Sequence, residues 1–311
     1  MRAGLRSLVL TFWLILFAGA CAHAAVKVVI VSSEHSAAYL EAARALVNEL
    51  ERAGLERSEV LEITAKEWAA AQPLTPRLFV ALGSAAANVL ARTPLPVPVL
   101  CTLVPRASFE LVLATSRRKA SSQFSALYLD QPWGRQLGLI RLALPEAHNI
   151  GVLWGPQSQT QAPAANASAQ VHGLKLLEAN VARDDLLFPS LKSVLEDADV
   201  LLAVPDPQVY NSSSIQNILL TTFRLRVPLV AFSPAYVHAG ALVAVYATPQ
   251  QLGLQAGTMA SAVLQGKALP ATPIYSQDFS VAVNDHVAHS LGLSLDSEAL
   301  RHQMRRREVM P

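Results

Sequence analysis

Between Asp199 and Gly266, strands that are apolar along their whole length alternate with helices, and this pattern constrains the fold more than any other feature of the 311-residue chain. The apolar runs cover residues 199–204, 228–232 and 241–247, and the helical stretches cover about 211–224 and 248–265. Strands of this kind belong to parallel sheets that helices cover on both faces. In such sheets ligands bind outside the carboxyl ends of the strands, so the search for a site starts there.

The amino-terminal part shows the same alternation of strands and helices. Strands are predicted at 26–31, 60–63, 78–82 and 97–103, with helices between them. The length of the chain favours two domains, and 52% hydrophobic against 15% charged residues suits large buried sheets. We therefore predict an α/β protein with two Rossmann-like lobes, which closes on a ligand by hinge motion.

Each predicted lobe is built from two segments of the chain. Lobe 1 takes residues 25–123 and about 249–272, and lobe 2 takes about 124–248 and 273–311. The polar, basic stretch 105–125 has no clear period, so we interpret it as a crossing between the lobes. The Pro-bearing connection 267–274 is interpreted as a return crossing.

The first 24 residues have the features of an export signal. Two arginines precede an apolar run at 8–20, and Ala22-His23-Ala24 forms a small-x-small cleavage site. The apolar run is shorter than the ~20 residues that a spanning helix needs. We expect a periplasmic mature protein that begins at Ala25; the alternative is a lipoprotein anchored through Cys21.

Composition and motifs argue against several classes of function. The net charge is only +2, and the basic excess lies at the end of the chain, so we expect no nucleic-acid partner. No G-x-S-x-G elbow, P-loop or G-x-G-x-x-G following a strand occurs. We expect no enzyme activity, catalytic residue, cofactor or metal site.

Polar residues at the predicted carboxyl ends of strands are the binding candidates. In lobe 1 these are Ser32, Ser33, Thr102 and the Gly83-Ser84 pair, which opens a helix. Free N–H groups at a helix start suit an anion such as a carboxylate, although a serine there can equally be a cap.

In lobe 2, Asp206 can take the ammonium group of an amino-acid-like ligand if it faces the cleft, or it can simply start a helix. Aromatic rings near strand ends are candidate cleft walls. The candidates of this second set are Tyr128, Trp154, Asp206, Ser233 and Tyr236, with Tyr210 and Phe232 as further aromatic residues near strand ends.

Several short motifs from Asp199 to Leu293 occur in the order known from one family. They are Pro205-Asp206, Val227-Pro228, Gly240-Ala241-Leu242, Leu252-Gly-x-Gln-Ala-Gly257, Leu264-x-Gly-Lys267, Val283-Asn284 and Leu291-Gly-Leu293. The chain resembles the ABC-transporter substrate-binding family of the tryptophan/tyrosine type. The resemblance implies a type I periplasmic binding protein fold, an acidic residue at position 206, a small-molecule ligand and a permease partner.

The chain also departs from the family pattern. An Asp-Pro after strand four is replaced by Val104-Pro105-Arg106, and a Gly-Gly-Asn-x-Thr-Gly run is replaced by the sequence at 121–126. The ligand is therefore expected only to be an amino-acid-like or other small polar or aromatic metabolite. The predicted function is capture of this solute for an ABC-type permease; the alternative is a non-transport envelope sensor or interaction module.

Overall fold

The computed structural model describes residues 25–68 and 74–309. The expected export signal and Cys21 lie outside the described residues. Within the described part, no helix combines the length and apolarity that crossing a membrane requires.

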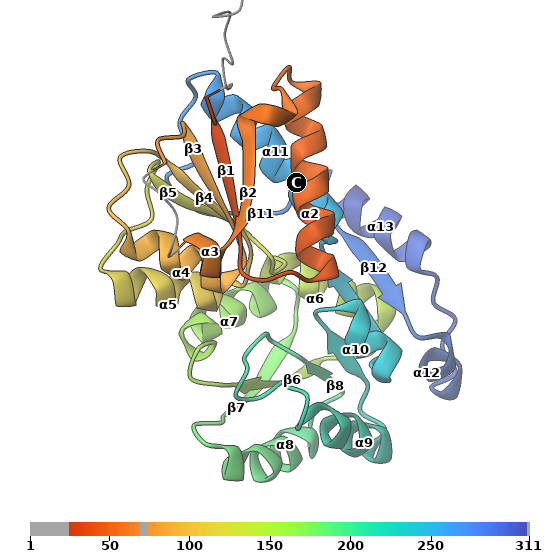
Figure 1. The fold of residues 1–311 in the computed structure, drawn as a ribbon. Helices are drawn as coiled ribbons and strands as arrows, with labels where there is room; N and C mark the ends of the chain where they lie inside the picture. Colours follow the sequence, from red (N-terminus) through yellow and green to blue (C-terminus); the bar gives the residue numbers. More distant parts are fainter. Residues whose placement is uncertain (1–24, 69–73, 310–311) are drawn as a thin grey trace, which may run out of the picture.

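The first sheet has six parallel strands in the order β11-β5-β4-β3-β1-β2 (Figure 1). Its strands are β1 (Val28–Ser32), β2 (Val60–Thr64), β3 (Leu78–Leu82), β4 (Val99–Val104), β5 (Phe124–Tyr128) and β11 (Ile274–Tyr275). The helices of this lobe are α2 (Ala37–Arg52), α3 (Ala65–Trp68), α4 (Ser84–Arg92), α5 (Arg106–Ser116) and α11 (Pro249–Leu264), with a short 3-10 turn η1 (Arg57–Glu59).

The second sheet also has six strands, in the order β12-β10-β9-β8-β6-β7, and only β12 runs antiparallel to its neighbour. Its strands are β6 (Asn149–Trp154), β7 (Lys175–Asn180), β8 (Val200–Leu202), β9 (Leu229–Ala231), β10 (Val243–Tyr246) and β12 (Ser280–Val283). The helices are α6 (Trp133–Ala143), α7 (Ala162–Val171), α8 (Leu187–Leu195), α9 (Ile215–Leu225), α10 (Pro234–Ala239), α12 (Asp285–Ser290) and α13 (Ser297–Val309), with 3-10 turns η2 (Gln159–Gln161) and η3 (Asp184–Leu186).

Helices cover both faces of each sheet, which explains why the central strands are apolar throughout. In the first lobe α2 and α11 pack on one face, and α4 and α5 pack on the other. In the second lobe α6, α7 and α13 lie on one face, and α8, α9 and α10 on the other. The two predicted α/β lobes are therefore present.

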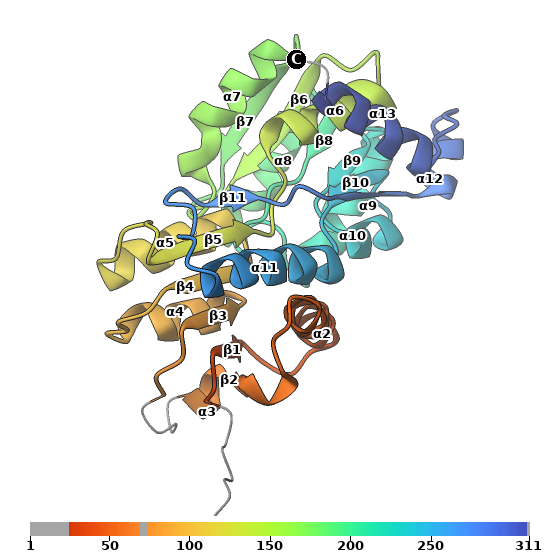
Figure 2. The same cartoon turned by 90° about the horizontal axis from the view of Figure 1, so that it is seen from above.

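Helices α2 and α11 approach each other closely because two glycines of α11 face α2 (Figures 1 and 2). A Cβ atom added to Gly253 would lie 2.2 Å from the carbonyl oxygen of Ala42, and one on Gly257 would lie 2.9 Å from that of Leu46. Any larger side chain would force the helices apart. The family motif at 252–257 thus has a packing role in this chain.

Three short segments join the lobes, and they differ from the predicted crossings. The chain leaves the first sheet after β5, returns after β10, and crosses again between β11 and β12. Strand β5, predicted to open lobe 2, pairs with β4 in the first sheet, with Phe124 opposite Val99. Lobe 1 therefore extends to Tyr128, and Ile274–Tyr275 also belongs to it.

The stretch 105–125, predicted to be a crossing, contains helix α5 instead. Ala107, Phe109 and Val112 of this helix are buried against the first sheet. Their spacing does not follow a regular helical period, so the sequence pattern gave no helix signal. The predicted return crossing at 267–274 is likewise displaced, because the chain still forms β11 before it crosses at 276–279.

Candidate functional site

A cavity of about 190 Å³ lies between the lobes at the carboxyl ends of strands from both sheets. It is lined by Pro105, Leu129, Asp130, Gln131, Gln136, Pro205, Phe232, Ser233, Pro234, Val245, Tyr246 and Ala247. Two of the three crossings contribute to this wall, at 129–131 and at Ala247, next to the end of β10. A mostly apolar hollow with a few convergent polar groups is the usual form of a small-molecule site.

Asp130 is the one ionised side chain in the cavity wall, all of which lies in the described residues. Its Oδ2 accepts a hydrogen bond from the backbone N–H of Arg106, at the amino terminus of α5. Burial raises the pKa of the Asp130 carboxyl to about 6, although the Arg106 N–H acts in the opposite direction. A carboxylate that is desolvated and lacks an ion-pair partner among the described residues is suited to a cationic ligand group.

The remaining polar groups of the wall are neutral. Gln136 Nε2 donates to the backbone oxygen of Gln131 at 2.7 Å. The Gln131 amide oxygen accepts from Arg135, while its Nε2 is buried without a hydrogen-bond partner in the described structure. Ser233 and Tyr246 complete the set, and burial raises the pKa of the Tyr246 hydroxyl, so that it stays protonated. These groups supply hydrogen bonds but no charge.

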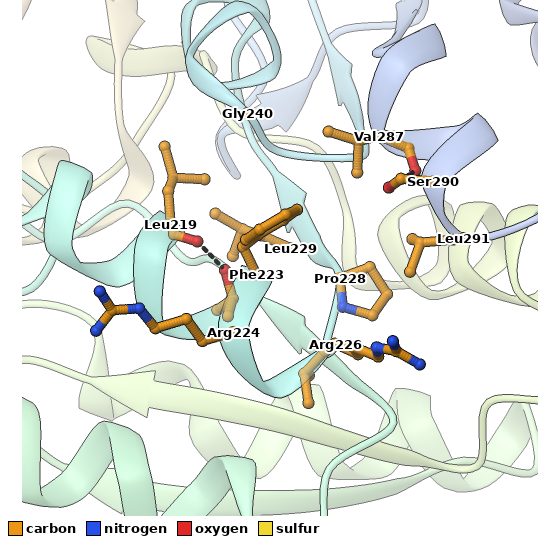
Figure 3. A pocket seen from close by; sticks show the side chains of 12 residues that line it. Leu219, Phe223, Arg224, Arg226, Pro228, Leu229, Gly240, Val287, Ser290 and Leu291 are labelled. Atoms are coloured by element: carbon orange, nitrogen blue, oxygen red, sulfur yellow. Dashed lines mark hydrogen bonds between the residues drawn. The ribbon is translucent and has the colours of Figure 1, made fainter.

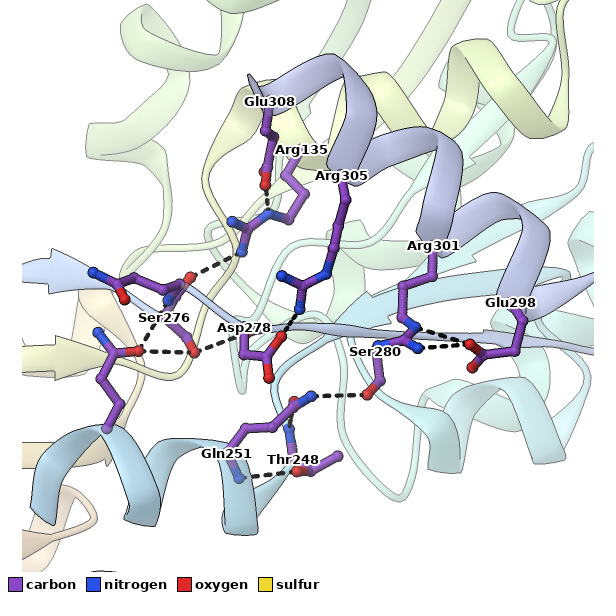
Figure 4. A network of polar contacts seen from close by, with 12 residues as sticks. Arg135, Thr248, Gln251, Ser276, Asp278, Ser280, Glu298, Arg301, Arg305 and Glu308 are labelled. Carbon is purple, nitrogen blue, oxygen red and sulfur yellow. Dashed lines mark hydrogen bonds and ion pairs between the residues drawn. The ribbon is translucent and has the colours of Figure 1, made fainter. Parts of the chain in front are cut away.

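Behind the cavity, Arg135 connects two crossings with the carboxyl-terminal helix (Figure 4). Its guanidinium donates to the backbone oxygen of Ser276 at 3.0 Å and to Glu308 at 2.6 Å, and it also bonds Gln131. It lies over the ring of Phe279, 4.3 Å from the centroid. This side chain is 7% exposed. Arg135 therefore ties the cavity wall to the crossing at 276–279.

An aromatic cluster supports the lobe 2 side of the cavity. The Phe232 ring, which lines the cavity, meets Tyr236 edge to face at 4.9 Å and Tyr210 at 6.1 Å between centroids. Burial raises the pKa of both tyrosines. The Tyr210 hydroxyl has no hydrogen-bond partner among the described residues. Tyr236 thus packs behind Phe232 and does not itself line the cavity.

Of the ten residues predicted to bind the ligand, Ser233 lines this cavity. The predicted anion site of lobe 1 is occupied from within: Ser33 Oγ accepts from the N–H of Ala86 at 3.1 Å, near the start of α4. A Cβ atom on Gly83 would lie 2.6 Å from Ser33 Oγ and 2.4 Å from the Tyr39 hydroxyl, so Gly83 makes room for this contact. Ser32 ends β1, and Ser84 is the first residue of α4.

Asp206 is 2% exposed and acts inside lobe 2. Its Oδ2 accepts from the N–H groups of Gln157 and Ser158 and from the Ser158 hydroxyl, at 2.9–3.0 Å. Its Oδ1 accepts from the N–H of Gln208 at 3.0 Å, and the absent side chain of Gly155 leaves space for the carboxylate. The structure thus brings Asp206 to the loop 155–158 instead of the cavity wall.

The other three predicted residues lie in the core. Tyr128 packs under α5, in edge contact with Phe109 at 5.9 Å. Trp154 meets Trp133 at 5.8 Å and is 2% exposed. Thr102 is fully buried, and its hydroxyl finds no partner within the described structure.

Sequence reasoning missed Asp130, Gln131 and Tyr246. A sequence signal exists for Asp130, because it lies two residues after Tyr128, which is itself a candidate near a predicted strand end.

A larger groove, of about 570 Å³, lies on lobe 2 between α9 and α12 (Figure 3). It includes Phe223, whose side chain is prominent at 70% exposure, and Pro228 and Leu229 at the amino end of β9. Ligands of open α/β sheets bind at the opposite, carboxyl ends. We therefore regard the interlobe cavity, and not this groove, as the candidate solute site.

Comparison with known proteins points to one kind of protein. The sequence profile of the family described as "ABC transporter substrate binding protein" matches residues 29–305. A tyrosine-binding protein of Clostridioides difficile (strain R20291) is 22% identical over 220 residues, which cover 70% of this chain and 63% of that relative. The match thus spans less than two thirds of the relative's length.

Solved structures share the two-lobed fold. A ligand-free, open substrate-binding protein with adhesive properties from Clostridium difficile has a TM-score of 0.68 at 20% identity, over 87% of this chain and 96% of that one. A domain from Streptococcus pneumonia in complex with L-Trp has a TM-score of 0.63 at 18% identity, over 88% and 97%. The predicted type I periplasmic binding protein fold is confirmed.

Proposed function

Since the chain belongs to the ABC transporter substrate-binding protein family, we propose that it is an exported protein that captures a small organic solute between its lobes and presents it to an ABC-type permease. The observation that carries the proposal is the interlobe cavity, which has an apolar wall and one desolvated carboxylate, Asp130, at the carboxyl ends of both sheets.

Binding in this proposal involves no covalent step. The solute places its apolar part against Phe232, Pro105 and Val245, and its polar part against Asp130 and Ser233. Closure of the lobes then removes water from these groups, which strengthens each electrostatic contact. The three crossings provide the hinge, and a permease would distinguish the closed from the open form.

A thermal-shift screen of the chain from residue 25 onward tests this proposal. A solute at 100 times its Kd stabilises the native state by about 2.7 kcal/mol, which corresponds to about 5–10 °C for a chain of this size. The screen covers amino acids, amines, purines, sugars and small anions. Asp130→Asn serves as the site variant. If no solute shifts the melting temperature, the capture role is contradicted.

The alternative is an envelope sensor or interaction module on the same fold. It is favoured by the altered sequence at 104–106, which enters the cavity wall through Pro105. Transport and sensing are separated by reconstituting the protein with candidate ABC-type permeases. Ligand-dependent stimulation of permease ATPase supports transport, whereas solute binding without stimulation supports sensing.

A further inference from the structure

We infer that the cavity selects a monocationic amine with an apolar body over the corresponding α-amino acid; this inference rests on the proposed function and names the solute class of that same site. The argument has three parts: the charge of the wall, the lack of a receptor for a carboxylate, and the shape of the apolar surface.

The charge of the wall comes from Asp130 alone, among lining residues that are all described. A ligand ammonium paired with this carboxylate leaves the closed cavity neutral. An amino acid brings a second negative charge with its carboxylate, and the closed cavity then carries one uncompensated charge. Burial of an unpaired charge is strongly unfavourable, so the wall discriminates against the zwitterion.

The nearest arginines cannot compensate that second charge without breaking existing contacts. Arg106 is ion-paired with Glu110 at 2.7 Å and donates to the Tyr275 hydroxyl at 3.2 Å. Arg135 is held by Glu308 and by the backbone oxygen of Ser276. Neither guanidinium lines the cavity.

The helix starts around the cavity carry no full positive charge that could neutralise a ligand carboxylate. The N–H of Arg106 at the start of α5 already donates to Asp130. The α10 helix is only six residues long and has Pro234, which lacks an N–H, at its first position. At the start of α4, Ser33 Oγ accepts the N–H of Ala86. A ligand carboxylate would therefore meet only neutral donors, namely backbone N–H groups at helix starts and the side chains of Ser233, Tyr246 and Gln131.

The apolar part of the wall suits a ring or a short branched chain. Phe232 offers one aromatic face and is held by Tyr236, while Pro105, Pro205 and Val245 add rigid aliphatic surface. An apolar cavity of about 150 Å³ is enough to hold benzene. The volume of about 190 Å³ therefore has room for one ring and a short aminoalkyl arm.

Isothermal titration with matched pairs tests this inference: phenethylamine against phenylalanine, and tyramine against tyrosine, with phenethyl alcohol as the uncharged analogue. We expect the amine of each pair to bind at least about tenfold more tightly, because only the amino acid leaves an uncompensated carboxylate in the closed cavity, and a factor of ten corresponds to only about 1.4 kcal/mol. The ammonium–Asp130 hydrogen bond itself corresponds to a factor of about 10–100. Asp130→Asn is expected to weaken amine binding by the same factor, while its Oδ1 can still accept the Arg106 N–H.

The matched control is Asp185→Asn, the same change at an exposed carboxylate of lobe 2, which should leave amine affinity unchanged. Circular dichroism and melting temperature show whether each variant is folded. Tighter binding of an amino acid than of its amine overturns the solute class but leaves solute capture intact. Equal amine affinity in Asp130→Asn and wild type also overturns it. If neither member of any pair binds, the inference fails, and the wider thermal-shift screen separately decides the proposed function.

Discussion

At the scale of single residues, Asp130 makes amine binding pH-dependent. Its carboxyl pKa is raised to about 6 by burial, while the Arg106 N–H and guanidinium lower it and Glu110 raises it. Only the ionised form pairs with an ammonium group, so affinity should rise with pH through 6 and level off above 7. A pKa of 6 implies about tenfold weaker binding at pH 5 than at pH 7.5. Titration calorimetry between pH 5 and pH 7.5 measures this change in amine affinity. An affinity that does not change with pH would contradict Asp130 as the group that binds the ammonium.

Asp206 illustrates the opposite role of a buried carboxylate. Asp206→Ala leaves the N–H groups of Gln157, Ser158 and Gln208 without their acceptor. Each lost partner costs about 1 kcal/mol or more, so we expect the free energy of unfolding to fall by roughly 3 kcal/mol, with little change in ligand affinity for the folded fraction. Urea unfolding and calorimetry measure the two effects. Lost affinity with unchanged stability would instead place Asp206 at the ligand.

At the scale of elements, α13 and α6 are joined through Arg135. Arg135→Ala removes bonds to Glu308, Ser276 and Gln131 from a nearly buried position. Because the buried Gln131 oxygen and the buried Ser276 carbonyl then lose their donor, we expect the free energy of unfolding to fall by about 2–4 kcal/mol. Arg141→Ala on the same helix, where the guanidinium bonds only backbone oxygens of 145 and 147, is the control and should cost less. Equal losses of unfolding free energy for the two variants, measured by urea unfolding, would contradict the role of Arg135 in joining α13 to α6.

Sequence predicted elements best where the signal was local. Thr248 and Gln251 form the capping box typical of a helix start, and the structure has both of its hydrogen bonds at the head of α11. Asn284 likewise caps α12 by accepting the N–H of Val287. Helix α5 was not predicted because its buried residues follow no regular helical period and because the acceptor of its first N–H, Asp130, lies 24 residues away in the sequence. The interlobe cleft was predicted, but apart from Ser233 the residues that line the cavity were not, since their position depends on pairing between distant strands.

At the scale of the whole molecule, capture requires the two lobes to approach each other. Addition of a saturating amine should lower the radius of gyration in small-angle X-ray scattering, because closure removes interlobe solvent. The Asp130→Asn variant at the same amine concentration is the control and should keep the radius of the free protein. A ligand that binds tightly in calorimetry without any change in radius would contradict hinge closure.

The close packing of α11 on α2 through Gly253 and Gly257 has a consequence for how the chain acquires its structure. The apolar stripe of α2, with Ala42 and Leu46, is covered by a helix that begins some 200 residues later. A polypeptide delivered amino end first, from a ribosome or through a translocation pore, therefore cannot complete its leading half until residues 249–275 have emerged. Until then the apolar face of α2 stays exposed and accessible to chaperones. The order of the segments along the chain therefore disfavours complete folding of the first lobe during delivery.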